Sequence, residues 1–250
     1  MASVNCAAKA LKAMHVSKSP IIFTNVWDVL SFNTVLSLNE GDNKAVKEIA
    51  TASSAIVGAA GCLPLSADLQ DGYGSRIEEV VTTAVQAGVS GANIEDSISS
   101  TDYGKMYPLD EQVRRLKSAL KAATEAGCPD FVLNARCDIF ALDDPDLDDD
   151  ARLKEAIIRG KAFLELGATT VFYLGGPRRG LTKAHLQTLV KELNGRVAAN
   201  LGGYAGDPTV LELAELGVAR VSIGDDLYLI AMNAIRKAAL AVFVEGRLPA

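Results

Sequence analysis

Three short stretches place acids, amides and an arginine directly after apolar runs. They are SADLQDGYG at 66–74, GANIED at 91–96 and LNARCD at 133–138. Carboxylates such as Asp68 and Glu95 can hold a cation, and a guanidinium such as that of Arg136 can bind a carboxylate or phosphate through two parallel hydrogen bonds. Because polar groups are costly in a core unless they are satisfied, the pattern predicts a binding site where these stretches meet.

The donor types indicate which cation such a site would take. Asp68 and Glu95 offer carboxylate oxygens, and Gln70 offers an amide that can orient a metal-bound water. The two histidines lie far apart, so a histidine-built zinc site is nearly excluded, and oxygen ligands suit Mg²⁺ or Mn²⁺. Taken singly, each group has a simpler interpretation: either acid could be a helix cap or a rim salt bridge, and Arg136 could be the partner of Glu95.

The elements that must position these groups are eight apolar, strand-like runs that alternate with segments of helical periodicity. Most of the helical segments end at a glycine, the expected helix stop signal. Repeated βα units predict one domain, residues 1–250, with an α/β fold, the (β/α)8 TIM barrel. No GxGxxG motif follows the first strand, which argues against a Rossmann domain. The predicted strands are 21–26, 48–53, 63–69, 91–96, 131–138, 169–174, 196–202 and 220–224.

In such a barrel the chemistry lies at the carboxyl ends of the strands. Asp68 and Glu95 are one βα unit apart, so we expect them on adjacent strands at similar height, with Arg136 on the next strand. Alternation along that strand points Cys137 away from the face that presents Arg136. Polar residues recur at the other strand ends: Asn25, Asp28, Ser53, Ser54, Asn93, Asp96, Asn134, Asp138 and Asn200.

The composition sets limits on partners and location. The chain has 22% charged and 49% apolar residues and a net charge of −6, which is ordinary for a globular protein and argues against a nucleic-acid partner. Its four cysteines show no CxxC spacing and no secretory signal precedes them, so we expect reduced thiols in the cytoplasm. We see no apolar run of about 18 residues and expect no membrane span.

The ordered set of motifs resembles the isocitrate lyase and phosphoenolpyruvate mutase superfamily, most closely its phosphoenolpyruvate mutase-like branch. TNVWDVLSF at 24–32 and LAELGVARVSIGDDL at 213–227 resemble the first and last strand motifs of that branch, so the resemblance extends from about residue 10 to 245. It implies a Mg²⁺-dependent lyase or mutase. Such an enzyme would cleave or rearrange a C–C or P–C bond of a small α-keto or α-hydroxy carboxylic acid through a pyruvate-like enolate.

The resemblance also implies roles for individual residues. Asp68 matches the metal-binding aspartate and Glu95 the metal-shell glutamate, while Gln70 stands where the family usually has an acid. Arg136 matches the substrate arginine, the one residue to which we assign a catalytic role. The remaining substrate-binding candidates lie in the turn after the second strand, in the glycine-tyrosine-glycine turn, and at the end of the seventh strand: Ala52, Ser53, Ser54, Tyr73, Gly74 and Asn200.

Three departures from the family pattern keep other functions open. The loop 97–111 lacks the catalytic cysteine of the isocitrate-cleaving lyases and has Lys105 as its only basic residue, which we interpret as solvent-exposed. The segment 54–63 is too short for a usual second βα unit. With Gln70, it motivates an alternative: a catalytically degenerate barrel that acts as an oligomeric interaction protein. A metal-independent barrel that binds a phosphorylated ligand through 202–208 and 222–226 ranks last.

The last predicted helix, 227–246, is apolar around much of its circumference. Such a helix is usually buried on more than one side. The resemblance implies a homotetramer in which this helix is exchanged between subunits, and we predict a homo-oligomer, at least a dimer.

Overall fold

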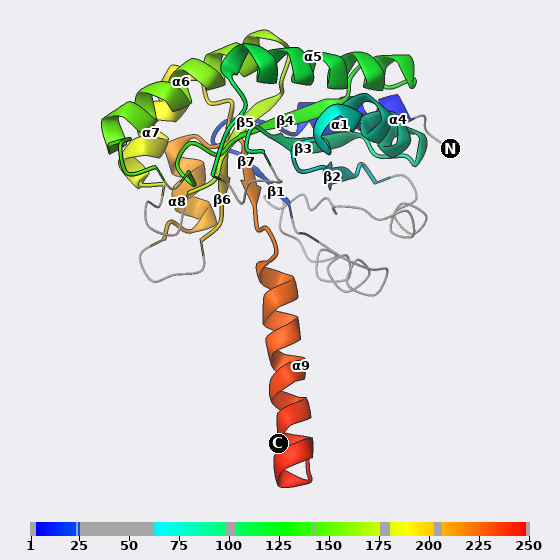
Figure 1. Ribbon diagram of the computed structural model, residues 1–250, viewed down its shortest axis with the longest axis vertical. Helices are drawn as coiled ribbons and strands as arrows, with labels where there is room; N and C mark the ends of the chain where they lie inside the picture. The colour runs from blue at the N-terminus through cyan, green and yellow to red at the C-terminus, as the bar shows by residue number, and fades with distance from the viewer. Residues whose placement is uncertain are drawn as a thin grey trace.

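A computed structural model describes residues 4–23, 25, 63–98, 104–142, 144–175, 181–202 and 207–248. Within these residues, seven strands form one sheet (Figure 1). They are β1 Ile21–Phe23, β2 Ser66–Asp68, β3 Gly91–Glu95, β4 Val132–Cys137, β5 Thr170–Tyr173, β6 Val197–Asn200 and β7 Arg220–Ser222. The helices are α1 Val4–Ala13, α4 Ile77–Gln86, α5 Leu109–Glu125, α6 Asp149–Glu165, α7 Lys183–Glu192, α8 Val210–Leu216 and α9 Asp226–Glu245, with a 3₁₀ turn, η1, at Gly74–Arg76.

The sheet is parallel throughout, and its order is β1-β7-β6-β5-β4-β3-β2. From β2 to β7 sequential strands are therefore neighbours, and the first described strand, β1, pairs with the last, β7, as in a sheet that curls toward closure. This confirms the predicted parallel α/β fold. The strand predicted at 48–53 and nearly all of the short segment 54–63 lie outside the described residues, so full barrel closure stays a prediction.

The two faces of the sheet have different partners. On β4, Leu133, Ala135 and Cys137 belong to the large apolar core beneath the helices, and α5, α6 and α7 follow one another over that outer side (Figure 1). The alternate residues face the interior, as the two-residue period of a strand requires. There Val132 joins Leu11 of α1 in a small apolar cluster that also includes Ile21 and Phe23. Polar residues occupy the interior positions nearer the carboxyl ends of the strands.

Local signals explain where the short helix α8 begins and ends. Thr209 accepts a hydrogen bond from the Glu212 backbone N–H, and the Glu212 carboxylate accepts one from the Thr209 N–H. This reciprocal capping box satisfies two of the N–H groups that a helix start leaves unpaired. The helix ends at Gly217, whose φ of 101° suits glycine. The loop that follows leads directly into β7 and the interior of the sheet.

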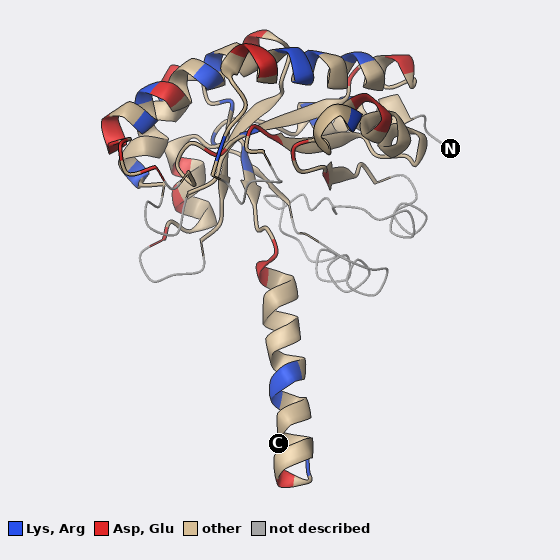
Figure 2. Ribbon diagram, in the orientation of Figure 1, with Lys and Arg blue, Asp and Glu red and all other residues tan. Residues whose placement is uncertain are grey.

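The last helix, α9, extends away from the rest of the described chain (Figure 1). None of its residues is buried, although it carries large apolar side chains such as Ile230, Ile235 and Phe243. Figure 2 shows acidic residues at its two ends and one basic band near its middle, which Arg236 and Lys237 form, with uncharged residues between them. By length and mean hydropathy of 1.6, α9 could cross a membrane. The sequence criterion of an uninterrupted apolar run of about 18 residues missed this helix, because Arg236 and Lys237 interrupt it; the expectation of no membrane span stays a prediction.

Candidate active site

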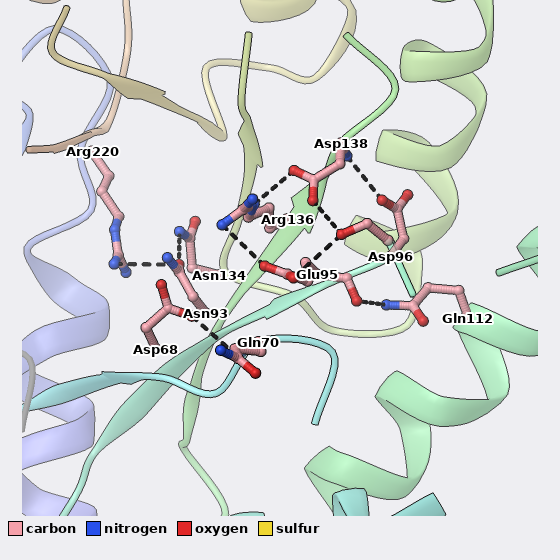
Figure 3. A network of polar contacts seen from close by, with 11 residues as sticks. Asp68, Gln70, Asn93, Glu95, Asp96, Gln112, Asn134, Arg136, Asp138 and Arg220 are labelled. Atoms are coloured by element: carbon pink, nitrogen blue, oxygen red, sulfur yellow. Dashed lines mark hydrogen bonds and ion pairs between the residues drawn. The ribbon is translucent and has the colours of Figure 1, made fainter. Parts of the chain in front are cut away.

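A cavity of about 320 Å³ opens at the carboxyl ends of the strands. Residues from β2, β3, β4, β5, β6 and β7 line it. Figure 3 shows four of them, Asp68, Asn93, Arg136 and Arg220, with their side chains pointing toward a common region. The volume is at the lower end of the range for small-molecule sites. The lining side chains include Asn25, Ser66, Asp68, Asn93, Arg136, Phe172, Asn200, Arg220, Ser222, Asp225 and Asp226.

Asp68 ends β2 with its side chain exposed at the cavity. Its carboxylate Oδ1 accepts a hydrogen bond from the Gln70 backbone N–H at 3.1 Å, which fixes the turn that leaves the strand. Asp68 pairs with Asn93 in the register of β2 and β3. Glu95 therefore lies two residues farther along its strand, about 7 Å at the usual rise per residue. The two predicted metal acids are on adjacent strands, as expected, but they are not level.

Arg136 is held between two carboxylates. Its Nη1 lies 3.0 Å from Glu95 Oε2, its strand-pair neighbour, and its Nε donates to Asp138 Oδ1 at 2.6 Å. The Ser97 hydroxyl hydrogen-bonds Asp138 Oδ2 at 2.6 Å and contacts Glu95 Oε1 at 3.3 Å. Figure 3 shows these groups as one connected network. The arginine that was expected to bind substrate is thus already fixed in orientation by charge-assisted hydrogen bonds.

This network contains more carboxylates than guanidinium groups, and both burial and this excess of negative charge shift the pKa values of its members. Burial is the main cause that raises the pKa of Glu95 to about 7; Arg136 opposes the shift, and the charges of Asp138 and Asp68 add to it. Burial opposes the charged form of Arg136, but Asp138 and Glu95 together raise its pKa above the usual range. A cation bound beside Asp68 would offset the excess negative charge.

A second ion pair, between Asp96 and Arg159 of α6, adjoins this network through Asp138. Asp96 accepts a hydrogen bond from the Asp138 backbone N–H at 2.9 Å and pairs with Arg159 Nη1 of α6 at 3.2 Å. Burial and the Asp138 charge raise the pKa of Asp96 to about 6. Arg159, which the sequence reading did not single out, therefore ties the ends of β3 and β4 to a helix. Its only sequence signal is a charged residue on the apolar side of that helix.

The residues around Tyr73 form a tight turn. Gln70, Gly72, Tyr73 and Gly74 all have positive φ, and the Asp71 carboxylate accepts hydrogen bonds from the Tyr73 N–H and the Tyr107 hydroxyl. Tyr73 is 52% exposed and, with Gly74, is absent from the described cavity lining. The turn shapes the segment after Asp68, and its predicted contact with substrate remains a proposal.

Three sets of residues remain: predicted residues that the structure places, predicted residues that it does not describe, and one cavity residue that was not predicted. Asn200 lines the cavity, Lys105 is exposed as expected, and Cys137 is buried on the helix side, where burial raises the pKa of its thiol. Ala52, Ser53, Ser54 and Asp28 lie outside the described residues. Arg220 also lines the cavity and was missed. Its signal was a charged residue at an interior position of the apolar strand RVSIG.

The donor set is compatible with a hard divalent cation. Asp68 and Glu95 supply carboxylate oxygens and Gln70 follows on the same turn, and Mg²⁺ is often held by one or two carboxylates with water completing its shell. No group of three or more His, Cys, Asp or Glu residues that could hold a metal occurs in the described part of the chain. The described carboxylates thus fit a water-rich, partly protein-bound cation rather than a closed structural site.

Sequence comparison gives the following relatives. Residues 34–243 match the family model described as phosphoenolpyruvate phosphomutase. The chain is 30% identical over 181 residues to an oxaloacetate decarboxylase of Chromohalobacter salexigens, covering 69% of this chain but only 56% of that protein. It is also 26% identical to an uncharacterized protein of Mycobacterium tuberculosis, over 94% of this chain and 90% of that one.

Two solved structures are similar in fold to this protein over nearly the whole chain. A protein from Burkholderia cenocepacia J2315, provisionally assigned as a phosphonomutase, has a TM-score of 0.81 and 29% identity, covering 98% of this chain and 100% of that one. Oxaloacetate acetylhydrolase in complex with oxalate has a TM-score of 0.80 and 22% identity, covering 99% and 90% of the two chains. At that identity the second likeness shows the fold alone.

Proposed function

Because the chain belongs to the phosphoenolpyruvate phosphomutase family, a family of lyases and mutases, we propose that it is a divalent-cation-dependent lyase or mutase. Its substrate would be a small α-keto or α-hydroxy carboxylic acid, in which a C–C or P–C bond is cleaved or rearranged through a pyruvate-like enolate. The observation that carries this proposal is the cavity at the carboxyl ends of the strands, which Asp68 and Arg136 line together. An acid and a guanidinium facing one small cavity suit a ligand that has both a metal-binding and an anionic part.

Asp68 would hold Mg²⁺ or Mn²⁺, with Glu95 binding directly or through water and Gln70 orienting one of those waters. When bound, the cation would supply a fixed positive charge that stabilises negative charge developing on the substrate. Arg136 would orient the substrate, because Glu95 and Asp138 hold its guanidinium in place before the ligand arrives. Asn200 would contribute an amide from β6, and the backbone N–H groups of residues 52–54 would bind a substrate carboxylate.

The test is calorimetric titration with Mg²⁺ and oxalate, a stable mimic of the pyruvate enolate. We expect oxalate to bind the wild type only when Mg²⁺ is present and the Asp68→Ala variant to bind at least tenfold more weakly. Glu165→Gln, at the exposed end of α6, is the control and should bind normally. Oxalate binding that does not depend on Mg²⁺ or on Asp68 would contradict the proposal and favour the catalytically degenerate barrel.

We also propose that the protein is a cytoplasmic homo-oligomer, a dimer or tetramer, in which α9 packs against another subunit. The support is that this long apolar helix buries none of its residues within one chain. Leaving so much apolar surface in water is unfavourable by roughly 25 cal/mol for each Å². A second copy of the chain would cover that surface.

A further inference from the structure

Arg220 is the second arginine in the cavity, and it faces the interior from a different wall than Arg136. It begins β7, shares the interior side of that strand with Ser222, and is 3% exposed. Successive strand pairs connect Arg136 to Phe172, Phe172 to Ala198, and Ala198 to Arg220, so three strand steps separate the two guanidinium groups. Both line the cavity that Asp68 borders (Figure 3).

The contacts of Arg220 are weak and uncharged. Its Nε lies 3.4 Å from Ser222 Oγ and its Nη2 lies 3.5 Å from Asn93 Oδ1, both at the outer limit of hydrogen bonding. The same Asn93 oxygen already accepts a hydrogen bond from Asn134 Nδ2. The guanidinium rests on the Phe23 ring, with its carbon 3.6 Å from the ring centroid. No carboxylate in the described ranges lies within 4.0 Å of Arg220, and its Nη1 has no hydrogen-bond partner there.

A buried charge without a paired acid is costly for the folded state. Burial lowers the pKa of Arg220 to about 9, while Asp68 opposes the shift, so the guanidinium stays protonated near neutral pH. Arg136, by contrast, has two carboxylates in direct contact. The hydroxyl of Ser66, also buried and lining the cavity, likewise lacks a hydrogen-bond partner among the described residues. The cavity therefore presents two donors, Arg220 Nη1 and the Ser66 hydroxyl, for which the described residues supply no acceptor.

We propose that Arg220 is a specificity-determining residue whose guanidinium binds a second carboxylate of the ligand. The proposal rests on the function proposed above, because the first carboxylate and its neighbouring oxygen would be held at the cation and Arg136. Asp68, Asp225 and Asp226 also line the cavity, and their charges would repel an anion. Binding of the dianion is therefore expected to require the divalent cation that offsets them.

The experiment compares two ligands that differ in one charge. L-Malate carries an α-hydroxy carboxylate and a second carboxylate, and its 4-amide replaces only the second carboxylate by a neutral group. With Mg²⁺ present, we expect calorimetry to show malate binding the wild type ~10- to 100-fold more tightly than the amide, the range for a hydrogen-bonded charge. Arg220→Met should abolish this preference by weakening malate binding alone. Equal affinities for the wild type, or an unchanged preference in Arg220→Met, would overturn the proposal.

A matched control and a stability measurement separate binding from packing. Arg196→Met makes the same change one strand away, where the guanidinium bonds the backbone oxygens of Ala168 and Thr169 outside the cavity lining. It should keep the malate preference. Since methionine can still pack on Phe23, Arg220→Met should melt at the same or a higher temperature than the wild type. A lower melting temperature with an unchanged preference would show that Arg220 serves only packing.

The outcome for the subsite can be distinguished from the outcome for the proposed function. If oxalate binding depends on Mg²⁺ and Asp68 but the malate preference is absent or independent of Arg220, only the subsite is wrong. If no carboxylate ligand binds the wild type with Mg²⁺, both proposals fail together.

Discussion

The two arginines that line the cavity differ in how their positive charges are balanced by neighbouring side chains. Arg136 sits between Glu95 and Asp138, so its charge is offset and its direction is fixed by short hydrogen bonds. Arg220 has an aromatic ring and two distant neutral acceptors. A paired guanidinium contributes to the order of the folded site, whereas an unbalanced one becomes favourable when an anion arrives. The two arginines therefore suit different tasks.

Asp138→Asn is expected to destabilise the fold. The change removes the charge that holds Arg136 Nε at 2.6 Å, and the amide offers one acceptor oxygen where the carboxylate accepts from both Arg136 and the Ser97 hydroxyl. We expect a loss of about 2–3 kcal/mol in the free energy of unfolding, measured by urea denaturation. Asp146→Asn, in the exposed loop before α6, should change stability by less than about 0.5 kcal/mol. Equal effects of the two variants would show that the network contributes no stability.

At the scale of elements, short turns and one terminal helix position the cavity. The turn after β2 reverses direction through residues with positive φ, and it carries the backbone that orients Asp68. The helix α1 supplies Leu11 to the apolar cluster on the interior side, beside Phe23, the ring that supports Arg220. Both elements act on the site through backbone geometry or packing rather than through direct chemistry.

Gly72→Ala should disturb the turn after β2 more than Gly74→Ala. Both glycines have positive φ, so both changes carry a conformational cost of about 1–2 kcal/mol. A Cβ at Gly72 would also lie 2.6 Å from Ile77 Cγ1, while a Cβ at Gly74 would meet nothing within 4 Å. We expect Gly72→Ala to be less stable than Gly74→Ala by about 1–3 kcal/mol in urea denaturation. Similar losses would mean that the steric contact is relieved by movement of Ile77.

The stability of the α1 region should depend on pH through His15. Its Nδ1 lies 2.9 Å from the Leu11 carbonyl oxygen and its Nε2 is buried without a partner among the described residues. Burial, and next the charge of Arg220, lower the pKa of His15 from 6.5 to about 3. As the pH falls through about 6.5, His15 therefore binds a proton in the unfolded chain but not in the folded protein. Its contribution to stability is present above pH 6.5 and is lost as the pH falls toward 3.

The comparison that isolates this effect is wild type against His15→Gln at pH 7 and pH 5. The wild type should lose about 2 kcal/mol more of unfolding free energy over this range than the variant, at about 1.4 kcal/mol for each unit below 6.5. His185→Gln, which alters the only other histidine, should lose stability with pH as the wild type does. Parallel curves for the wild type and His15→Gln would contradict the predicted proton linkage.

At the scale of the whole molecule, the described part of the chain forms a curled parallel sheet with its helices and one further helix, α9, that contacts little of them. Element α9 leaves the end of β7, next to Asp225 and Asp226 of the cavity lining. Another subunit that packs on the start of α9 would therefore also lie near the cavity mouth. Assembly and ligand binding are expected to be linked for that reason.

We expect the wild type to sediment as a dimer or larger species at micromolar concentration. The double variant Ile230→Asp, Phe243→Asp places charges on side chains that are 66% and 85% exposed in one chain, and it should weaken assembly at least tenfold. Glu245→Gln at the helix end is the control and should assemble normally. A wild-type monomer would refute the exchange of α9. Flotation of a monomeric wild type with lipid vesicles would show instead that a membrane covers this helix.

The sequence by itself determined the parallel α/β architecture and the strand ends that bear Asp68, Glu95 and Arg136. Alternating strand and helix periodicity and polar residues after apolar runs are local signals, and a single chain displays them directly. The same alternation predicted that Cys137 faces the helices. Strand limits were less accurate, because hydrogen bonding between strands, rather than apolar character, decides where a ladder ends.

Only the tertiary structure decided which polar groups contact one another. Register placed Asp68 opposite Asn93 instead of Glu95, and folding brought Asp138 to Arg136 and Arg159 to Asp96. Arg220 is 127 residues from Asn93 in sequence but contacts it across the cavity. Charge balance depends on such distances in space, and a one-dimensional pattern does not contain them. For that reason the sequence revealed the paired arginine, while the unbalanced one became visible only in three dimensions.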